Sequence, residues 1–237
     1  QPITPAFGQS AAPKASPDGK WLAYINTYEG KDSLALVDTT GALWPQRLVD
    51  GDDFYMQPAW SPDGKRLAWI AWNHPNMPWD GTILRMGELQ EHDGNLPALQ
   101  RIMTVAGGEQ VSIFQPEFSP DGRFLAYVSD ESGWWQLYLY EIASGEHRQL
   151  THVQAEHGLP AWVQGMRTYA FSFRGDRLFF LRNQPGQVSL WQLDLQSAQE
   201  TRLPLDTAYT MLDHICATHA GVALVASGGR SPARIIT

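Results

Sequence analysis

The sequence contains a single cysteine, Cys216, among its 237 residues. One thiol cannot form an internal disulfide or a cysteine-based zinc site, which fits a reducing compartment, and we expect the cytoplasm. No apolar run approaches the roughly 18 residues that a membrane-spanning helix requires, and residues 1–30 lack the basic and then apolar layout of a signal peptide. The sequence therefore predicts neither a membrane segment nor a membrane partner.

Positive charge is also scarce, because 17 Lys and Arg stand against 25 Asp and Glu and give a formal net charge of -8. An acidic chain without a basic stripe is repelled by phosphate backbones, so nucleic acid is not expected as a partner. Hydrophobic residues make up 43% of the chain, which is too much for a disordered protein. The 21 Gly, 16 Pro and 10 Trp favour turns and strands over helices, which indicates an all-β globular protein.

A four-residue motif recurs along the chain, and an alternating apolar run follows each copy. Three copies read Ser-Pro-Asp-Gly, at 16–19, 61–64 and 119–122, and two degenerate copies lie at 172–175 and 218–221. Ser and Asp can bond the nearby backbone, Pro presets its φ angle, and Gly accepts the positive φ that closes a hairpin. Each copy therefore predicts a strand, a tight turn and a second strand.

Two further strands are expected after each hairpin. Alternating runs predict third strands at 33–38, 82–86, 136–140 and 188–193, and short closing strands are expected at 46–49, 100–103, 148–151 and 201–203. Four strands in each unit of roughly 45 to 55 residues are the signature of a β-propeller blade. The sequence thus predicts an all-β fold of four-stranded antiparallel blades, about five of them within residues 1–237.

The opening segment, residues 1–4, is similar to the closing strand expected at 148–151. The first residue is Gln1 rather than Met. We therefore expect the chain to begin inside a propeller, as a processed or excised piece of a ring with more than five blades; closure at five blades is the alternative.

The most unusual stretch is residues 72–81, Trp-Asn-His-Pro-Asn-Met-Pro-Trp-Asp-Gly, which lengthens the connection between the second and third strands of its blade. His74, Asn76, Trp79 and Asp80 can contact a ligand through hydrogen bonds and an aromatic wall, so they are candidate substrate-binding residues. The competing interpretation, which the two prolines and two tryptophans favour, is a rigid plug that packs against a neighbouring blade or domain.

Glu156 is a further candidate substrate-binding residue, because a loop carboxylate can bind the free amino terminus of a peptide. The competing interpretation, which we favour from the sequence, is an ordinary surface carboxylate. Glu146 and Glu156 also lie near His147, His152 and His157, and imidazole and carboxylate suit several divalent metals. No zincin-type spacing is present, so we expect no metal site and no cofactor, and a metal-dependent propeller enzyme ranks last among the hypotheses.

Catalytic motifs are missing from the sequence. It contains no Gly-x-Ser-x-Gly nucleophile elbow, no Gly-x-Gly-x-x-Gly and no Walker sequence. We therefore expect no catalytic residue in this chain.

Together with the repeats, several segments resemble the propeller of the prolyl oligopeptidase (S9) family of serine peptidases. The resemblance is to its acylaminoacyl-peptidase and dipeptidyl-aminopeptidase-like bacterial members in particular. The segments are 72–81, 113–122, 132–138, 155–158, 160–162 and 169–171.

The resemblance implies that the whole chain, residues 1–237, belongs to a propeller of seven or eight blades that caps a C-terminal α/β-hydrolase domain carrying Ser, Asp and His. That domain is absent from this chain, which should be inactive alone. The resemblance also implies a filter that admits short peptides to a buried site, with the insert 72–81 and Glu156 able to reach the cavity between the domains. Because TolB-like propellers share the Ser-Pro-Asp-Gly repeat, the alternative is a stand-alone propeller that binds a protein partner.

Overall fold

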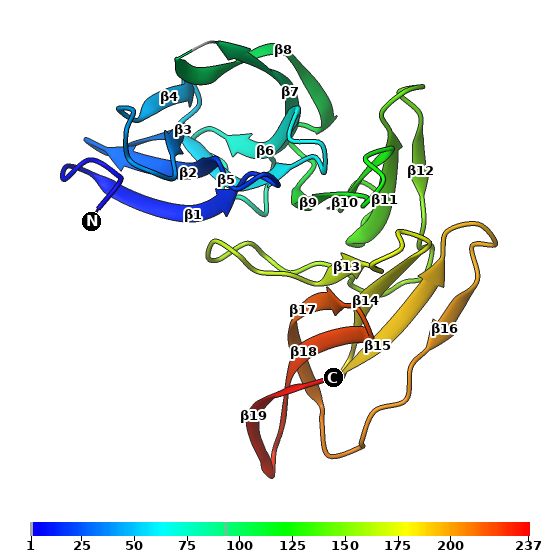
Figure 1. Cartoon of the computed structure of the whole chain (residues 1–237). Helices are drawn as coiled ribbons and strands as arrows, with labels where there is room; N and C mark the ends of the chain where they lie inside the picture. The colour runs from blue at the N-terminus through cyan, green and yellow to red at the C-terminus, as the bar shows by residue number, and fades with distance from the viewer. Residues whose placement is uncertain (1, 93) are drawn as a thin grey trace. The chain divides into compact units, whose positions relative to one another are not determined.

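The structure, a computed structural model, describes residues 2–92 and 94–237. These residues form nineteen strands and no helix, so nothing among them is a helix that could cross a membrane. The strands make five antiparallel sheets, four with four strands and one with three (Figure 1). The predicted all-β fold of four-stranded blades is confirmed.

The chain divides into two compact units. The first unit contains Gln1–Phe118 and Ala161–Gly165, and the second contains Ser119–Pro160 and Met166–Thr237. In the first unit, one sheet has the order β1 (Gln9–Ala15), β2 (Trp21–Tyr28), β3 (Lys31–Asp38) and β4 (Gln46–Val49). The next has the order β5 (Phe54–Trp60), β6 (Arg66–Trp72), β7 (Ile83–His92) and β8 (Asn95–Gly107).

The third sheet begins with β9 (Ile113–Phe118), which belongs to the first unit, and continues with β10 (Phe124–Ser129), β11 (Gln136–Glu141) and β12 (His147–Gln149). The fourth sheet contains β13 (Tyr169–Phe171), β14 (Arg177–Gln184), β15 (Gln187–Asp194) and β16 (Glu200–Arg202). The fifth sheet contains β17 (Met211–Thr218), β18 (Gly221–Gly228) and β19 (Ser231–Ile236). Within the units, β5 contacts β1 and β9, and β13 contacts β17. Within each unit, the first strands of neighbouring sheets are therefore adjacent, as in a propeller.

The Ser-Pro-Asp-Gly turns adopt one hydrogen-bonded geometry. In the third copy, the Ser119 hydroxyl donates to Asp121 Oδ1 at 2.6 Å and accepts the backbone N–H of Phe124 at 2.9 Å. In the degenerate fourth copy, Arg174 replaces the Asp of the motif, and the Ser172 hydroxyl donates instead to Asp176 Oδ1 at 2.7 Å. The turn glycines have φ angles between 70° and 73° in these four copies, a region that Gly enters without strain.

The core of the first unit joins its two complete sheets. Buried residues of the first sheet, such as Leu34 and Leu36, pack in one cluster with Leu67 and the fully buried Trp69 of the second. Leu96 of β8 is buried in the same cluster, and β8 contacts β4. The hairpin of β7 and β8 therefore extends beyond its own sheet and covers the neighbouring one (Figure 1).

The lengths predicted for the two strands of this hairpin are wrong. The expected strands at 82–86 and 100–103 are in fact ten and thirteen residues long, at Ile83–His92 and Asn95–Gly107. Apolar residues in the extension, including Leu89 and Leu96, pack on the core and make the longer strands favourable.

The core of the second unit likewise joins two sheets. Phe179, Leu181 and Leu190 of the fourth sheet pack with Leu212 and Ile215 of the fifth. Burial of apolar surface is the main stabilising contribution to such sheet packing.

The expectation of a closing strand at residues 1–4 is wrong for the described part, since Pro2–Thr4 form no strand. Gln1 lies outside the described residues. Ile3 instead packs against the cluster of Tyr24, Ala35 and Val37 in the first sheet. Apolar contact, without backbone pairing, thus fixes this segment.

Candidate functional site

All five candidate residues lie at the sheet ends opposite the Ser-Pro-Asp-Gly turns. The turns join first strands to second strands, so connections from second to third strands, and from one sheet to the next, emerge at the other end of each sheet. The insert 72–81 occupies most of the connection 73–82 from β6 to β7, and Glu156 lies in the long connection from β12 to β13. The insert belongs to the first unit and Glu156 to the second.

His74 is tied to the loop that precedes β5. Its backbone N–H donates to Asp53 Oδ2 at 3.0 Å, and its ring Nδ1 lies 3.1 Å from the same oxygen. These hydrogen bonds, the backbone one above all, hold the pKa of Asp53 below its usual range. The His74 ring also packs on Phe54 with centroids 4.8 Å apart, yet the side chain stays 73% exposed. His74 is therefore positioned but accessible.

Asn76 and Asp80 stabilise the insert itself. The Asn76 amide donates to the backbone oxygen of Glu109 at 2.8 Å, and Asp80 Oδ2 accepts the N–H of Met77 at 2.9 Å. The buried Ser112 hydroxyl also donates to the backbone oxygen of Pro78 at 2.7 Å. These contacts hold the insert in one conformation, in which His74 and Asp80 are exposed and Asn76 and Trp79 are half-buried.

Trp79 packs against a distant segment of the chain. Its ring lies 4.3 Å, centroid to centroid, from that of Trp162, which is 68% exposed. The neighbouring Gln164 amide donates to the backbone oxygen of Tyr55 at 3.0 Å and accepts the N–H of Gln57 at 3.2 Å. Segment 161–165 is thereby held against β5, and its exposed tryptophan extends the aromatic surface of the insert.

Glu156 is held by both its backbone and its side chain. Its N–H and carbonyl group pair with Asn183 at 3.1 and 2.8 Å, which forms an isolated bridge to the end of β14. Its side-chain Oε2 accepts the N–H of Trp135 at 2.9 Å. The carboxylate is thus more firmly fixed than the expected surface carboxylate would be.

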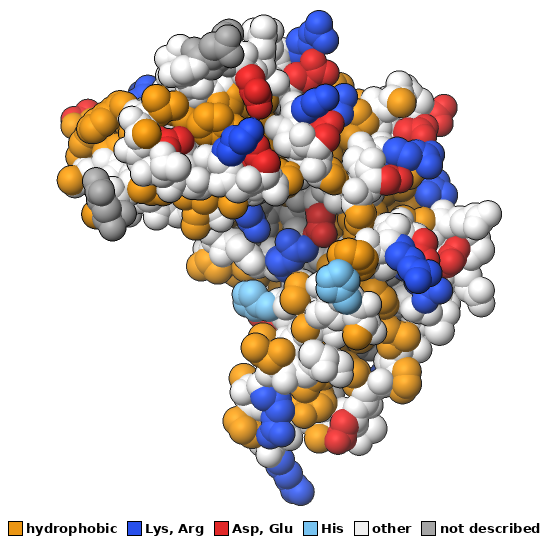
Figure 2. Space-filling view, viewed as in Figure 1, with side chains coloured by type: hydrophobic (Ala, Val, Ile, Leu, Met, Phe, Trp, Pro, Cys, Tyr) orange, Lys and Arg blue, Asp and Glu red, His pale blue; other side chains and the backbone are white. Residues whose placement is uncertain are grey.

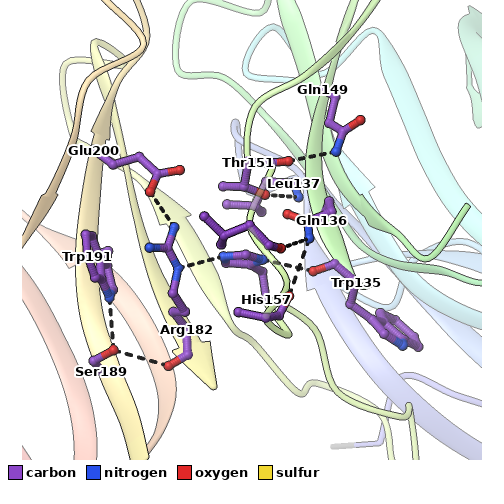
Figure 3. A network of polar contacts seen from close by, with 12 residues as sticks. Trp135, Gln136, Leu137, Gln149, Thr151, His157, Arg182, Ser189, Trp191 and Glu200 are labelled. Atoms are coloured by element: carbon purple, nitrogen blue, oxygen red, sulfur yellow. Dashed lines mark hydrogen bonds and ion pairs between the residues drawn. The ribbon is translucent and has the colours of Figure 1, made fainter. Parts of the chain in front are cut away.

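His157, next to Glu156, belongs to a buried polar network (Figure 3). Its Nδ1 lies 3.0 Å from the backbone oxygen of Trp135, and its Nε2 accepts Arg182 Nε–H at 3.0 Å. Because a guanidinium only donates, Nε2 must carry the lone pair and Nδ1 the proton. Burial, together with the charge of Arg182, lowers the pKa of His157 to about 4, so the ring is neutral at neutral pH.

Arg182 is the centre of this network. It is 4% exposed, pairs with Glu200, and its guanidinium lies 4.1 Å from the centroid of the Trp191 ring. A buried cation requires such partners, because desolvation otherwise makes it costly. The network fixes the backbone of His157, and with it the adjacent Glu156.

A cavity of about 380 Å³ adjoins Glu156 in the second unit. Its walls come from the fourth and fifth sheets and from the segment 156–159. Its lining residues are Glu156, His157, Gly158, Leu159, Thr168, Leu181, Asn183, Val188, Met211, Leu212, Asp213, Val225, Ser227 and Ala233.

The three histidines considered for a metal site have different surroundings. His157 faces a guanidinium, and His147 Nδ1 lies 2.8 Å from the hydroxyl of Tyr127. His152 is exposed. Across residues 2–92 and 94–237, no three His, Cys, Asp or Glu side chains are grouped so that they could hold a metal ion.

The chain is similar to known peptidases. No family model matches it. An uncharacterized peptidase of Bacillus subtilis, YuxL, is 27% identical over 171 residues, which are 72% of this chain and 23% of that protein. A puromycin-hydrolyzing peptidase of Mycobacterium tuberculosis matches with 28% identity and a TM-score of 0.84, over 99% of this chain and 37% of that one. The predicted resemblance to propellers of prolyl oligopeptidase family peptidases is confirmed.

Similarities to more distant solved structures show the fold alone. Prolyl oligopeptidase B from Galerina marginata has a TM-score of 0.71 at 12% identity, over 97% of this chain and 32% of that one. TolB from Acinetobacter baumannii has a TM-score of 0.60 at 16% identity, over 96% and 54%. The chain thus spans only 23% of YuxL and 37% of the mycobacterial peptidase.

Sequence reasoning missed Arg182 and Glu200, the ion pair of the buried network. Arg182 follows the apolar run 178–181 of a strand, and a charged residue directly after such a run was the available signal. Its partners lie 25 residues before it and 18 residues after it, so no local pattern pairs them.

Proposed function

We propose that residues 1–237 are the propeller of a serine peptidase of the prolyl oligopeptidase family. In this proposal the propeller controls the access of short peptides to a catalytic α/β-hydrolase domain elsewhere in the same protein. The supporting observation is the 28% identity to the mycobacterial peptidase over 99% of this chain, which covers only 37% of that protein. The larger remainder leaves room for a catalytic domain.

The physical basis of the proposed control is steric. Rigid sheets held by cores such as that around Trp69 exclude folded proteins, whereas a short peptide can pass. A closed chamber also keeps water from the reacting bond and strengthens electrostatic interactions inside it.

His74, Asn76, Trp79 and Asp80 would contact the peptide from the insert. Trp79 with Trp162 offers an exposed aromatic surface, and His74 offers a ring nitrogen. Asn76 and Asp80 would act chiefly by holding the insert in shape, because their side chains bond its own backbone and that of Glu109.

Glu156 would bind the peptide's amino terminus through a charge-assisted hydrogen bond. A blocked, acylated terminus carries no charge and gains nothing from a carboxylate. This residue therefore favours an aminopeptidase or dipeptidyl-aminopeptidase type of substrate over an acylaminoacyl type.

The first test is the length of the natural gene product. We expect a protein much heavier than the 26.5 kDa of this chain, with a Gly-x-Ser-x-Gly sequence beyond Thr237 and a matching intact mass in the source cells. A product that ends near Thr237 would contradict the proposal and leave a stand-alone, protein-binding propeller.

The second test addresses the insert in the full-length enzyme. Trp79→Ala should raise KM for a short chromogenic peptide severalfold and leave kcat nearly unchanged, since the residue would bind substrate without touching the reacting bond. Trp44→Ala is the matched control, because this tryptophan is 74% exposed and lies between β3 and β4, at the end of its sheet that carries the Ser-Pro-Asp-Gly turn. Equal KM values in the wild type and the Trp79 variant would refute a substrate contact there.

A further inference from the structure

A second cavity lies at the end of the first two sheets that carries the Ser-Pro-Asp-Gly turns. Its volume is about 530 Å³, and ligand sites start at about 300 Å³. The turns 16–19 and 61–64 contribute to its wall, together with β2, β5 and the hairpin of β7 and β8. All of these segments belong to the first unit, so the cavity lies entirely within it.

Two tryptophans line this cavity. Trp21 begins β2 and Trp60 ends β5, and both are half-buried and pack on the core around Trp69. The indole N–H of Trp60 donates to the backbone oxygen of Lys14 at 2.9 Å, which fixes the ring. A ring that is held in place before binding loses little conformational entropy when a ligand packs on it. The cavity therefore presents rigid aromatic surface.

The extension of the hairpin of β7 and β8 supplies another side of the cavity. Leu89, Glu91 and Pro97 line it, and they lie beyond the strand length that a blade requires, since β10 and β11 have six residues each. Leu89 packs on the same core, and Pro97 is buried. Apolar surface next to the tryptophans favours a ligand with an alkyl part, in proportion to the area that it buries.

The charged groups of the wall are mainly acidic. Asp18, Asp63 and Glu91 line the cavity, and Lys65 is the basic member of the described lining residues. Over the face that Figure 2 shows, acidic and basic side chains are mixed, so attraction of a cation there depends on the carboxylates nearest to it. The three carboxylates outnumber the single ammonium group and favour a cationic ligand over an anion.

Two of the three carboxylates have an oxygen available for a ligand. Asp63 Oδ1 accepts the N–H of Lys65 at 3.0 Å and thereby holds the turn. Asp63 Oδ2 and the oxygens of Glu91 make no hydrogen bond to a residue in the described part of the chain. Asp18 differs, because its Oδ2 pairs with Lys20 Nζ at 3.1 Å. Asp63 and Glu91 are therefore the carboxylates that can receive a donor.

A guanidinium group matches both the aromatic and the acidic part of the wall. It is planar and weakly hydrated, so it stacks on aromatic rings, and its N–H groups donate in the same plane to carboxylates. An ammonium group is compact and strongly hydrated, and it gains less from a flat ring. An uncharged planar group could stack as well, but it would leave the carboxylates desolvated without a charged partner.

We propose that this cavity binds a guanidinium group on an alkyl chain, stacked on the two tryptophans and donating to Asp63 Oδ2 and to Glu91. The alkyl chain packs on the apolar side of the hairpin extension. The inference goes beyond the proposed function, because the cavity lies at the opposite end of the second sheet from the insert between β6 and β7.

The test is isothermal titration of the full-length protein at neutral pH with three N-acetyl amino acid methylamides. The derivatives of arginine and citrulline share a planar shape and differ in charge, whereas the lysine derivative keeps the charge and lacks the plane. We expect the arginine derivative to bind about tenfold or more tightly than the citrulline derivative, as charge-assisted hydrogen bonds imply, and severalfold more tightly than the lysine derivative. An arginine derivative that binds only as tightly as either of the others, or not at all at about 10 mM, would overturn the inference.

Variants of the cavity separate the carboxylates from the aromatic wall. Asp63→Asn keeps the Oδ1 acceptor of the turn, and together with Glu91→Gln it should reduce the affinity for the arginine derivative to that for the citrulline derivative. Trp60→Leu should weaken binding severalfold through loss of stacking, with a circular dichroism melt to verify folding. Asp121→Asn, at the same position of the third turn, is the matched control and should bind like the wild type. Unchanged affinity in the double variant, or in a folded Trp60→Leu variant, would refute the site.

A further probe identifies the source of the guanidinium group. Butylguanidinium that binds much more tightly than the arginine derivative supports a free guanidine compound, and butylguanidinium that binds equally or more weakly supports an arginine side chain of a polypeptide; both results sustain the cavity as a guanidinium site.

Failure of the proposed function is distinguishable from failure of this inference. Glu91→Gln should weaken binding of the arginine derivative while KM and kcat for a short peptide stay unchanged, because Glu91 lies at the end of the sheet away from the insert. A rise in KM that parallels the loss of arginine affinity would place the guanidinium group in a peptidase site and overturn the inference. Arginine binding that persists in a protein without peptidase activity would contradict the proposed function alone.

Discussion

The buried histidine of the second unit makes stability depend on pH in a defined window. His157 is 1% exposed and accepts a hydrogen bond from a guanidinium, and its pKa falls to about 4 from an unperturbed 6.5. At a pH between these two values, His157 binds a proton in the unfolded chain and stays unprotonated in the folded chain. The free energy of unfolding must therefore decrease as the pH falls from about 6.5 to about 4.

The magnitude follows from the size of the shift. A difference of one pKa unit corresponds to about 1.36 kcal/mol, so a shift from 6.5 to about 4 corresponds to about 3 kcal/mol at full effect. This stability is fully present above the unfolded pKa and lost progressively toward the folded one. The carboxyl groups of Asp18 and Asp38, with pKa values of about 2, contribute their own losses at lower pH.

The assay is urea unfolding followed by tryptophan fluorescence at pH 7, 6, 5 and 4. His157→Gln cannot take up a proton, so the difference in unfolding free energy between wild type and variant isolates this residue. We expect the difference to shrink by about 3 kcal/mol from pH 7 to pH 4. A difference that stays constant over this range would refute the assignment of a buried, neutral His157.

Three further predictions concern the networks and edges of the fold. Arg182→Met should lower the free energy of unfolding by about 3 to 5 kcal/mol in urea titrations, because it leaves Glu200 and His157 without their donor; a loss below about 1 kcal/mol would contradict the buried pair. Ser119→Ala should cost about 1 to 2 kcal/mol, since two turn hydrogen bonds disappear, while the exposed control Ser144→Ala should cost almost nothing. β19 is the outer strand of a three-stranded sheet within the described part of the chain, and its Ile235 is 76% exposed. We expect the purified chain to self-associate through this edge and Ile235→Lys to reduce association in sedimentation velocity experiments, and an unchanged sedimentation profile would argue against edge pairing.

The blade pattern was predictable because its determinants are local. A turn such as 119–122 is closed by hydrogen bonds among residues no more than five positions apart, so the sequence alone specifies it. The insert 72–81 was located for the same reason, since it lies between two regular strands.

The remaining features depend on contacts between residues far apart in the chain. Gln164 bonds the backbone of Tyr55 and Gln57 more than 100 residues away, and nothing in its own segment indicates this. The extended hairpin of β7 and β8 was missed although Asp93-Gly94 is a typical turn dipeptide, because its length depends on burial of Leu96 in another sheet.

The two ends of the sheets have different roles, and this difference locates function. At the Ser-Pro-Asp-Gly end, the turns share one geometry even where Asp176 replaces the usual aspartate, which is the behaviour of a structural element. At the opposite end, the connections vary from the two residues between β14 and β15 to the ten between β6 and β7 and the nineteen between β12 and β13. Binding residues often lie on loops of this kind, because the rigid sheets hold the loops in place whatever their length and sequence. The insert and Glu156 both lie at this variable end, and there the search for substrate contacts is best concentrated.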